Sequence, residues 1–228
     1  MPNVKNTILD TLLSFVAPHL CSGCGKIGNT FCDNCKYNIN QEPFFGCILC
    51  GVPNNQGICY SHKMKFQQAF VVGERSGSLQ RLIGGFKFRN IKQSSTSLAE
   101  LLCARLPVIH RLSAVLVPLP TIPAHIRERG YDHMLLITNE LSRLTRHPVE
   151  QLLVRRTMSV QHKANRKDRF LQAKVAFEVC GKIDSSCVYI LVDDIVTTGA
   201  TIGRAAELLA EAGATSVWIA VVARQPLD

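Results

Sequence analysis

Four pairs of metal-binding side chains share a two-residue spacer in the first part of the chain. Three are C-x2-C pairs and the fourth ends in histidine, giving Cys21, Cys24, Cys32, Cys35, Cys47, Cys50, Cys59 and His62. A two-residue spacer lets one tight turn direct both ligands at one ion, and Gly25 and Gly51 can relax the backbone behind two turns. Zinc prefers four sulfur or nitrogen ligands. The spacing therefore predicts two zinc sites.

The pairing of these turns is left open by spacing alone. Consecutive pairing gives one site of Cys21, Cys24, Cys32 and Cys35 and another of Cys47, Cys50, Cys59 and His62, whereas interleaved pairing is also compatible. Disulfides are the alternative, but regular C-x2-C pairs favour thiolates in a reducing compartment. A site with four protein ligands leaves no open position, so we expect a structural or interaction role. Cys103, Cys180 and Cys187 lie in apolar contexts and are predicted to be core residues.

Composition describes a globular protein that favours anionic partners. The 228 residues are 46% hydrophobic and 19% charged, enough for one full-sized domain and a small module, and the net charge is +9. Two stretches concentrate the cations, 75–92 and 155–174. No apolar run approaches the roughly 18 residues that span a bilayer, because Asp10 and Pro18 interrupt the N-terminal one. We expect a cytoplasmic protein without membrane insertion.

The remaining chain alternates strand-like and helix-like segments. Continuous apolar runs predict strands at 69–73, 114–118, 175–179, 188–192 and 216–223, and helical periodicity appears at 97–106, 134–144 and 202–212. Strands buried on both faces are typical of a parallel sheet covered by helices. The predicted fold is therefore α/β, a doubly wound, mostly parallel sheet over residues 66–228. An N-terminal helix and double zinc-ribbon module would occupy residues 1–65.

A strand, two acids and a hydroxyl-rich loop follow one another from Val188 to Thr201. The loop contains Thr197, Thr198, Gly199, Ala200 and Thr201, and it precedes a predicted helix. Free N–H groups at a helix N-terminus bind phosphate, and a glycine allows close approach of the anion. Asp193 and Asp194 stand near the end of a strand, where they could hold sugar hydroxyls or a hydrated Mg²⁺. The alternative is a strand-to-helix turn capped by threonine.

This string resembles the ribose-phosphate-binding motif of type I phosphoribosyltransferases. Together with the N-terminal cysteine pairs and the chain length, it resembles the ComF family (ComF/GntX), bacterial proteins associated with competence for DNA uptake. Several further segments match family positions: Lys87, 117–120, the Arg127-x-Arg129-Gly130-Tyr131 segment, and Gln161, Arg169 and Ala176-Phe177 of a flexible-loop signature. Asp132-His133 and Gln172 depart from the family pattern, which usually has Asn-Gln and Asn there.

The resemblance implies binding of 5-phosphoribosyl diphosphate and Mg²⁺. The 5′-phosphate would lie in the Thr197–Thr201 loop, the ribose hydroxyls would meet Asp193 and Asp194, and Mg²⁺ would bridge ribose and diphosphate. In a phosphoribosyltransferase, a nitrogen nucleophile would displace pyrophosphate, with Arg129, Arg169 and Lys87 neutralising the leaving group. The sequence does not identify an acceptor base, and a sensing use of the same site remains an alternative.

Two non-enzymatic interpretations compete with this one. The first is an accessory factor that binds single-stranded DNA beside a competence helicase, for which Phe86 and Phe88 around Lys87, followed by Arg89, supply aromatics among cations. DNA binding would weaken steeply with salt and tolerate loss of the acids, whereas sugar-phosphate binding would need both the acids and Mg²⁺. The second is a zinc-ribbon adaptor with a vestigial phosphate site, which the intact acid pair argues against.

Overall fold

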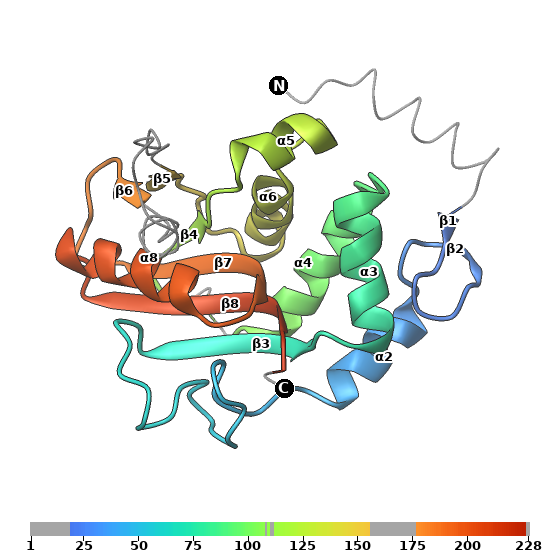
Figure 1. The fold of residues 1–228 in the computed structure, drawn as a ribbon, viewed down its shortest axis with the longest axis horizontal. Helices are drawn as coiled ribbons and strands as arrows, with labels where there is room; N and C mark the ends of the chain where they lie inside the picture. Colours follow the sequence, from blue (N-terminus) through green and yellow to red (C-terminus); the bar gives the residue numbers. More distant parts are fainter. Residues whose placement is uncertain (1–18, 108, 110–111, 156–176, 227–228) are drawn as a thin grey trace, which may run out of the picture.

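A four-stranded parallel sheet with helices on both faces forms the centre of the molecule (Figure 1). The computed structural model describes residues 19–107, 109, 112–155 and 177–226. Its strands are β1 (His19–Leu20), β2 (Ile27–Gly28), β3 (Gln68–Glu74), β4 (Ala114–Pro118), β5 (Leu153–Arg155), β6 (Phe177–Val179), β7 (Val188–Val196) and β8 (Ser216–Arg224). Its helices are α2 (Asp33–Gln41), α3 (Gly77–Phe88), α4 (Ser94–Arg105), α5 (Pro123–Arg129), α6 (His133–Thr145) and α8 (Ala200–Glu211).

The central sheet has the strand order β3-β8-β7-β4, and every neighbouring pair is parallel. All five residues of β4 are buried, as is most of β8. Burial is nearly continuous because helices cover both faces of the central strands. The predicted doubly wound α/β fold is confirmed.

Alternate residues of each strand enter two separate hydrophobic cores. On β7, Ile190 joins the core formed with α3, α4 and α6, whereas Tyr189 and Leu191 join the core formed with α8. This alternation follows from the two-residue period of a strand. Helix α6, in the chain after β4, packs on one face of the sheet. Helix α8, after β7, packs on the opposite face.

Two predictions about the strands need correction. The strand expected at 175–179 appears as β6, which pairs antiparallel with β5 outside the central sheet. Its three residues are buried, exposed and half-buried in turn, as in a ribbon with one covered face. The strand expected to end at Val192 continues to Val196, because β7 still pairs with β8 beyond the end of β4.

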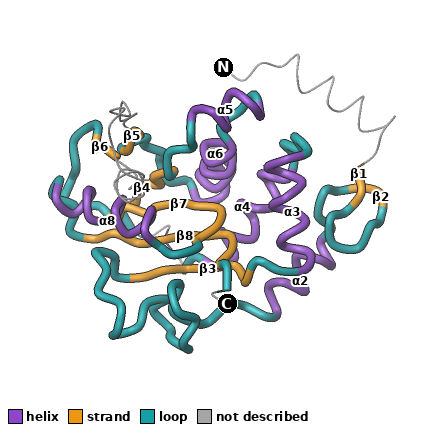
Figure 2. Tube along the Cα trace, in the orientation of Figure 1, coloured by secondary structure: helices purple, strands orange, loops and turns teal. Residues whose placement is uncertain are grey.

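The cysteine-rich region is mostly loop, apart from the short β1–β2 pair and α2 (Figure 2). Cys21 and Phe31 of this region enter the core beneath α3 and α4, whereas Cys47, Ile48 and Leu49 enter the core beneath α8. Its two halves therefore pack on opposite faces of the central sheet. Within the described residues, no helix is long and apolar enough to cross a membrane.

The cysteines outside this region are less buried than expected. Cys103 and Cys187 are half-buried, and Cys180 is exposed. The prediction of a core position is wrong for Cys180, which directly follows the short strand β6 and precedes Gly181, whose φ of 111° turns the chain away.

Candidate functional site

The acid pair lies at the carboxyl edge of the sheet, between β4 and β7. Pairing of these strands ends at Pro118 and Val192, so Asp193 and Asp194 come directly after it. The chain after β4 covers one face through α6 and the chain after β7 covers the other through α8. Ligands of open α/β sheets bind where the connections diverge in this way. The predicted position of Asp193 and Asp194 at such a crevice agrees with the structure.

Asp194 is buried and paired with two side chains from other elements. Its Oδ2 lies 2.7 Å from Nζ of Lys87, near the end of α3, and 2.7 Å from Nε2 of His133, at the start of α6. Burial alone would raise the pKa of Asp194, but the bonds from His133 and Lys87 outweigh it and hold the pKa below its ordinary value. Asp194 is therefore ionised and already neutralised by protein groups.

The pKa of Asp193 is shifted in the opposite direction to that of Asp194. Burial, and next the charge of Asp194, raise the pKa of Asp193 well above its ordinary value. Its Oδ1 accepts a hydrogen bond from the backbone N–H of Asp194 at 2.8 Å, and the charges of Lys87 and Arg155 only partly offset the rise. Carboxylate oxygens are the donors that Mg²⁺ prefers, and a divalent cation here would relieve the excess negative charge. The residues present therefore fit Mg²⁺.

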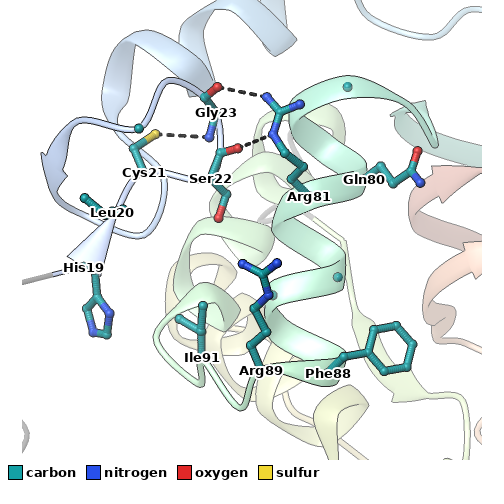
Figure 3. A pocket seen from close by; sticks show the side chains of 14 residues that line it. His19, Leu20, Cys21, Ser22, Gly23, Gln80, Arg81, Phe88, Arg89 and Ile91 are labelled. Atoms are coloured by element: carbon teal, nitrogen blue, oxygen red, sulfur yellow. Dashed lines mark hydrogen bonds between the residues drawn. The ribbon is translucent and has the colours of Figure 1, made fainter.

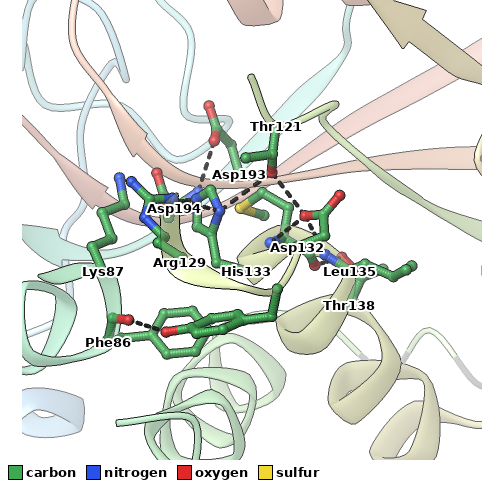
Figure 4. A network of polar contacts seen from close by, with 12 residues as sticks. Phe86, Lys87, Thr121, Arg129, Asp132, His133, Leu135, Thr138, Asp193 and Asp194 are labelled. Atoms are coloured by element: carbon green, nitrogen blue, oxygen red, sulfur yellow. Dashed lines mark hydrogen bonds and ion pairs between the residues drawn. The ribbon is translucent and has the colours of Figure 1, made fainter. Parts of the chain in front are cut away.

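His133 connects Asp194 to a third cation (Figure 4). Its Nδ1 lies 3.0 Å from Nη1 of Arg129 and its Nε2 lies 2.7 Å from Asp194. Because a guanidinium can only donate, Nδ1 accepts that bond, and Nε2 carries the hydrogen donated to Asp194. Thr121 donates to Asp132 at 2.7 Å, and Asp132 caps the N-terminus of α6, which fixes the helix that carries His133.

Positive side chains and the acid pair line one cavity of about 350 Å³. Its lining includes Lys87, Arg129, Arg155, Asp193 and Asp194, so most of the predicted catalytic set does come together. Arg155 on β5 is oriented by a hydrogen bond from its Nε to the backbone oxygen of Pro120 at 2.8 Å, and burial lowers its pKa. Three cations beside two acids suit a phosphorylated sugar.

Two side chains of this cavity were missed as site residues by sequence reasoning. His133 was visible only as a departure from the family pattern, and Arg155 only as the first cation of a long basic run. Nothing in spacing indicates that Arg155 faces Asp193, because β5 and β7 are brought together by the fold.

The remaining predicted residues differ in whether they reach this cavity. Arg127 is exposed on α5 and does not line the cavity, whereas Thr201 does. Arg169, Gln161 and Gln172 lie outside the described residues.

The hydroxyl-rich loop forms the N-terminus of α8. Gly199 takes a φ of 75°, in the left-handed region that favours glycine, and Thr197, Thr198 and Ala200 are exposed. The Oγ1 of Thr198 accepts a weak bond from the N–H of Ala200 at 3.4 Å. The loop therefore presents hydroxyls and the N-terminal N–H groups of a 12-residue helix to an incoming anion.

The eight metal-binding side chains assemble into two consecutive groups. Within each group the ligand atoms lie within 4.8 Å of one another. The Sγ atoms of Cys21 and Cys35, and of Cys50 and Cys59, lie 3.7 Å apart. Sulfurs bound tetrahedrally at about 2.3 Å from zinc would be separated by about 3.8 Å. The groups therefore have the spacing of zinc sites rather than disulfides, and the interleaved pairing is excluded.

His62 offers Nδ1 as its ligand atom. This atom lies 3.1 Å from Sγ of Cys59 and 3.6 Å from Sγ of Cys47. The contact with His62 lowers the pKa of Cys59 to about 6, so its thiolate, the form that binds zinc, is available at neutral pH. Gly25 and Gly51 take φ values of 76° and 79°, as expected for the turns behind the ligand pairs.

A wider groove of about 1100 Å³ separates the first cysteine group from α3 (Figure 3). Arg81 crosses it to donate to the backbone oxygens of Ser22 and Gly23, at 2.7 and 2.9 Å. Phe88, whose side chain is 74% exposed, and Arg89 lie at its other end. Phe88 also lines the acid-pair cavity, so the two hollows adjoin.

Comparison with known proteins gives relatives along most of the chain. Residues 182–228 match the phosphoribosyl transferase domain family, and this segment contains the acid pair and the hydroxyl-rich loop. Competence protein F of Haemophilus influenzae is 28% identical over 210 residues, covering 86% of this chain and 91% of that protein. These findings confirm the resemblance to the ComF family.

Two more relatives extend the likeness to ComF proteins. Competence protein ComFC of Bacillus subtilis is 26% identical over 196 residues, which cover 80% of this chain and 78% of the relative. DNA utilization protein YhgH of Escherichia coli is 28% identical over 187 residues, which cover 76% of this chain and 81% of the relative.

Proposed function

We propose that this ComF-like protein binds 5-phosphoribosyl diphosphate with Mg²⁺ in the cavity beside Asp193 and Asp194. The observation that carries the proposal is the placement of this acid pair between the phosphate-type loop and three cations. The 5′-phosphate binds at the N-terminus of α8 through Thr197, Thr198 and the N–H groups around Gly199. The ribose hydroxyls bind the acid pair.

The charges of the cavity suit transfer of the phosphoribosyl group. Lys87, Arg129 and Arg155 line this cavity. There they would stabilise the negative charge that grows on the diphosphate as the C1–O bond breaks. The acids favour the positive charge that develops on the sugar, and Mg²⁺, when bound, further neutralises the diphosphate. A nitrogen nucleophile forms the new bond at C1 and pyrophosphate leaves. Arg169 is proposed to add a further cation.

A titration of 5-phosphoribosyl diphosphate and Mg²⁺ into the zinc-loaded protein tests this proposal. We expect saturable binding by the wild type, and loss of binding in the Asp193→Asn/Asp194→Asn variant. Binding would justify a screen of nitrogen bases for pyrophosphate release. Absence of binding by a folded, zinc-replete wild type would overturn the proposal.

The groove between the first cysteine group and α3 favours a second role, binding of single-stranded DNA. The exposed ring of Phe88 can stack on a base, and Arg89 can contact a phosphate. The guanidinium of Arg129 lies 5.9 Å from the centre of the Phe88 ring, so cations flank this ring on the cavity side too. The names of the relatives, competence proteins and a DNA utilization protein, support a role in DNA uptake. We propose that the protein takes this role in the cytoplasm, beside a competence helicase.

Fluorescence anisotropy of a labelled oligonucleotide tests the second role. We expect Phe88→Ala to weaken binding about tenfold, because stacking on one aromatic contributes about 1–3 kcal/mol. The Asp193→Asn/Asp194→Asn variant should bind DNA as the wild type does. DNA binding that needs both acids, or that does not change with salt, would contradict this role.

The zinc groups complete the proposed function as structural elements. We propose that two zinc ions fold a module over residues 1–65, which precedes the phosphoribosyltransferase-like domain of residues 66–228. Four protein ligands surround each ion, so the ions hold the fold rather than take part in the chemistry.

A further inference from the structure

The second cysteine–histidine group packs directly under the phosphate-type loop. Leu49 lies between the ligands Cys47 and Cys50, and its side chain is only 8% exposed. A Cβ built on Gly199 would lie 2.1 Å from Cδ2 of Leu49, so the loop backbone rests on this side chain. The loop therefore touches the metal-binding turn at Gly199, whose φ of 75° lies in the left-handed region.

A second contact lies one helical turn further along α8. A Cβ on Gly203 would lie 2.4 Å from Cε of Met64, two residues after the ligand His62. Gly203 N–H donates to the oxygen of Gly199 at 2.8 Å, so the two contacts support the same first turn of the helix. Leu49 and Met64, at the two ends of the second group, thus both contact the first turn of α8.

A buried arginine fixes the metal-binding turn to the sheet. Arg224, at the end of β8, is 4% exposed and donates to the backbone oxygens of Ile48 and Leu49, each at 3.2 Å. Its Nη1 also pairs with Glu74 at 3.0 Å. The turn itself is closed by the N–H of Gly51, which donates to the oxygen of Cys47 at 2.8 Å. The sheet therefore anchors the turn, and a zinc ion would hold Cys50 and Cys59, whose Sγ atoms lie 3.7 Å apart, together.

We propose that the zinc-loaded second group positions the phosphate-binding loop through Leu49, so that the loop takes its binding conformation only when this group holds its metal. The inference rests on the proposed function in naming phosphoribosyl diphosphate as the ligand. The mechanism itself is local: Thr197, Thr198 and Ala200 are exposed, and the buried contact beneath Gly199 comes from Leu49. Leu49 is a positioning residue, because it supports the loop from the side opposite the anion.

Hydrogen exchange of residues 197–203, measured in Leu49→Ala together with its zinc content, tests the inference. We expect Leu49→Ala to retain two zinc ions and to exchange these amides at least about tenfold faster, because the loop loses its buried support. The affinity for phosphoribosyl diphosphate should fall by a similar factor. Val52→Ala is the matched control, since this side chain in the same segment is 54% exposed. Cys50→Ser/Cys59→Ser should reproduce the fast exchange when its second zinc is lost.

The outcomes separate this inference from the proposed function. Unchanged exchange at 197–203 in zinc-loaded Leu49→Ala would overturn the inference, even if the wild type binds its ligand. Fast exchange in Leu49→Ala, together with no binding of phosphoribosyl diphosphate by the wild type, would support the positioning of the loop by Leu49. The same result would overturn the proposal that phosphoribosyl diphosphate is the ligand. Leu49→Val, a smaller truncation, gives the same comparison if Leu49→Ala is poorly folded.

Discussion

The two neighbouring acids differ in charge environment although they occupy consecutive positions of one strand. Asp194 is paired with Lys87 and His133, whereas Asp193 is half-buried beside the charge of Asp194. Sequence reasoning identified both acids but not this asymmetry, because the partners come from α3 and α6, far away in the chain. The division suggests that Asp194 organises the cavity and Asp193 meets the ligand.

The asymmetry predicts opposite effects of two identical substitutions. Asp194→Asn should lower the free energy of unfolding by about 3 kcal/mol, because it leaves the buried charge of Lys87 unpaired. Asp193→Asn should raise it by about 1 kcal/mol, because it removes a carboxylate that ionises at a cost. Thermal melts of the two variants beside the wild type measure both changes. Equal destabilisation by both substitutions would contradict the asymmetry.

The stabilisation by Asp193→Asn should depend on pH. The pKa of Asp193 is raised in the folded protein, so its ionisation costs stability once the pH exceeds the unfolded value near about 4. The advantage of Asp193→Asn should therefore be absent at about pH 4 and grow as the pH rises toward the folded-state pKa of about 8. An advantage that grows on acidification would show that the pKa is shifted the other way.

His133 should act through its two ring nitrogens, one accepting and one donating. Glutamine offers an amide oxygen and an amide N–H, so His133→Gln can still accept from Arg129 and donate to Asp194. We expect His133→Gln to bind phosphoribosyl diphosphate within about threefold of the wild type, and His133→Ala to bind it at least about tenfold more weakly. Calorimetric titration of both variants decides between a bridging and a merely space-filling histidine.

At the scale of elements, the strands of the central sheet were predictable, whereas helices α2, α3 and α5 were not. The central strands are continuous apolar runs because both of their faces are covered. Such runs are typical of parallel α/β sheets and can therefore be recognised in the sequence. Helix α3 carries the adjacent glycines Gly84 and Gly85, which oppose helix formation, so no helix was predicted there. Tertiary packing of Leu82, Ile83 and Phe86 overrides that preference and places Lys87 at the cavity.

Helix α5 gives a matched test of which arginine serves the cavity. Arg129 is half-buried against His133, whereas Arg127 is exposed and lies outside the cavity lining. Arg129→Ala should weaken binding of phosphoribosyl diphosphate at least about tenfold, because a charge-assisted contact contributes about 1.5–3 kcal/mol. Arg127→Ala should bind as the wild type does. Similar losses in the two variants would indicate a general effect of charge rather than a placed side chain.

At the scale of the whole molecule, the two cysteine groups brace opposite faces of one sheet. The first group enters the core under α3 and α4, and the second enters the core under α8. The spacing of the cysteine pairs predicted both groups. It could not predict that the groups pack on opposite faces of the sheet, because their placement depends on the positions of α2 and β3 in the fold. Metal binding at the two groups would thereby be linked to both helical layers.

Loss of each metal should therefore affect a different face. Cys24→Ser/Cys32→Ser should lose one zinc ion and speed hydrogen exchange in α3, while residues 197–203 exchange as in the wild type. Mass spectrometry of zinc content and of exchange in the same samples measures this. Fast exchange on both faces after loss of the first group alone would contradict independent bracing.

Asp193 is the residue proposed to bind the ribose and metal of phosphoribosyl diphosphate. The most direct measurement is a calorimetric titration of this ligand with Mg²⁺ into zinc-loaded Asp193→Asn, compared with the wild type. Because this variant should be at least as stable as the wild type, weaker binding cannot reflect unfolding. We expect saturable binding by the wild type and a loss of at least about tenfold in the variant. Equal binding by the two proteins would contradict the claim.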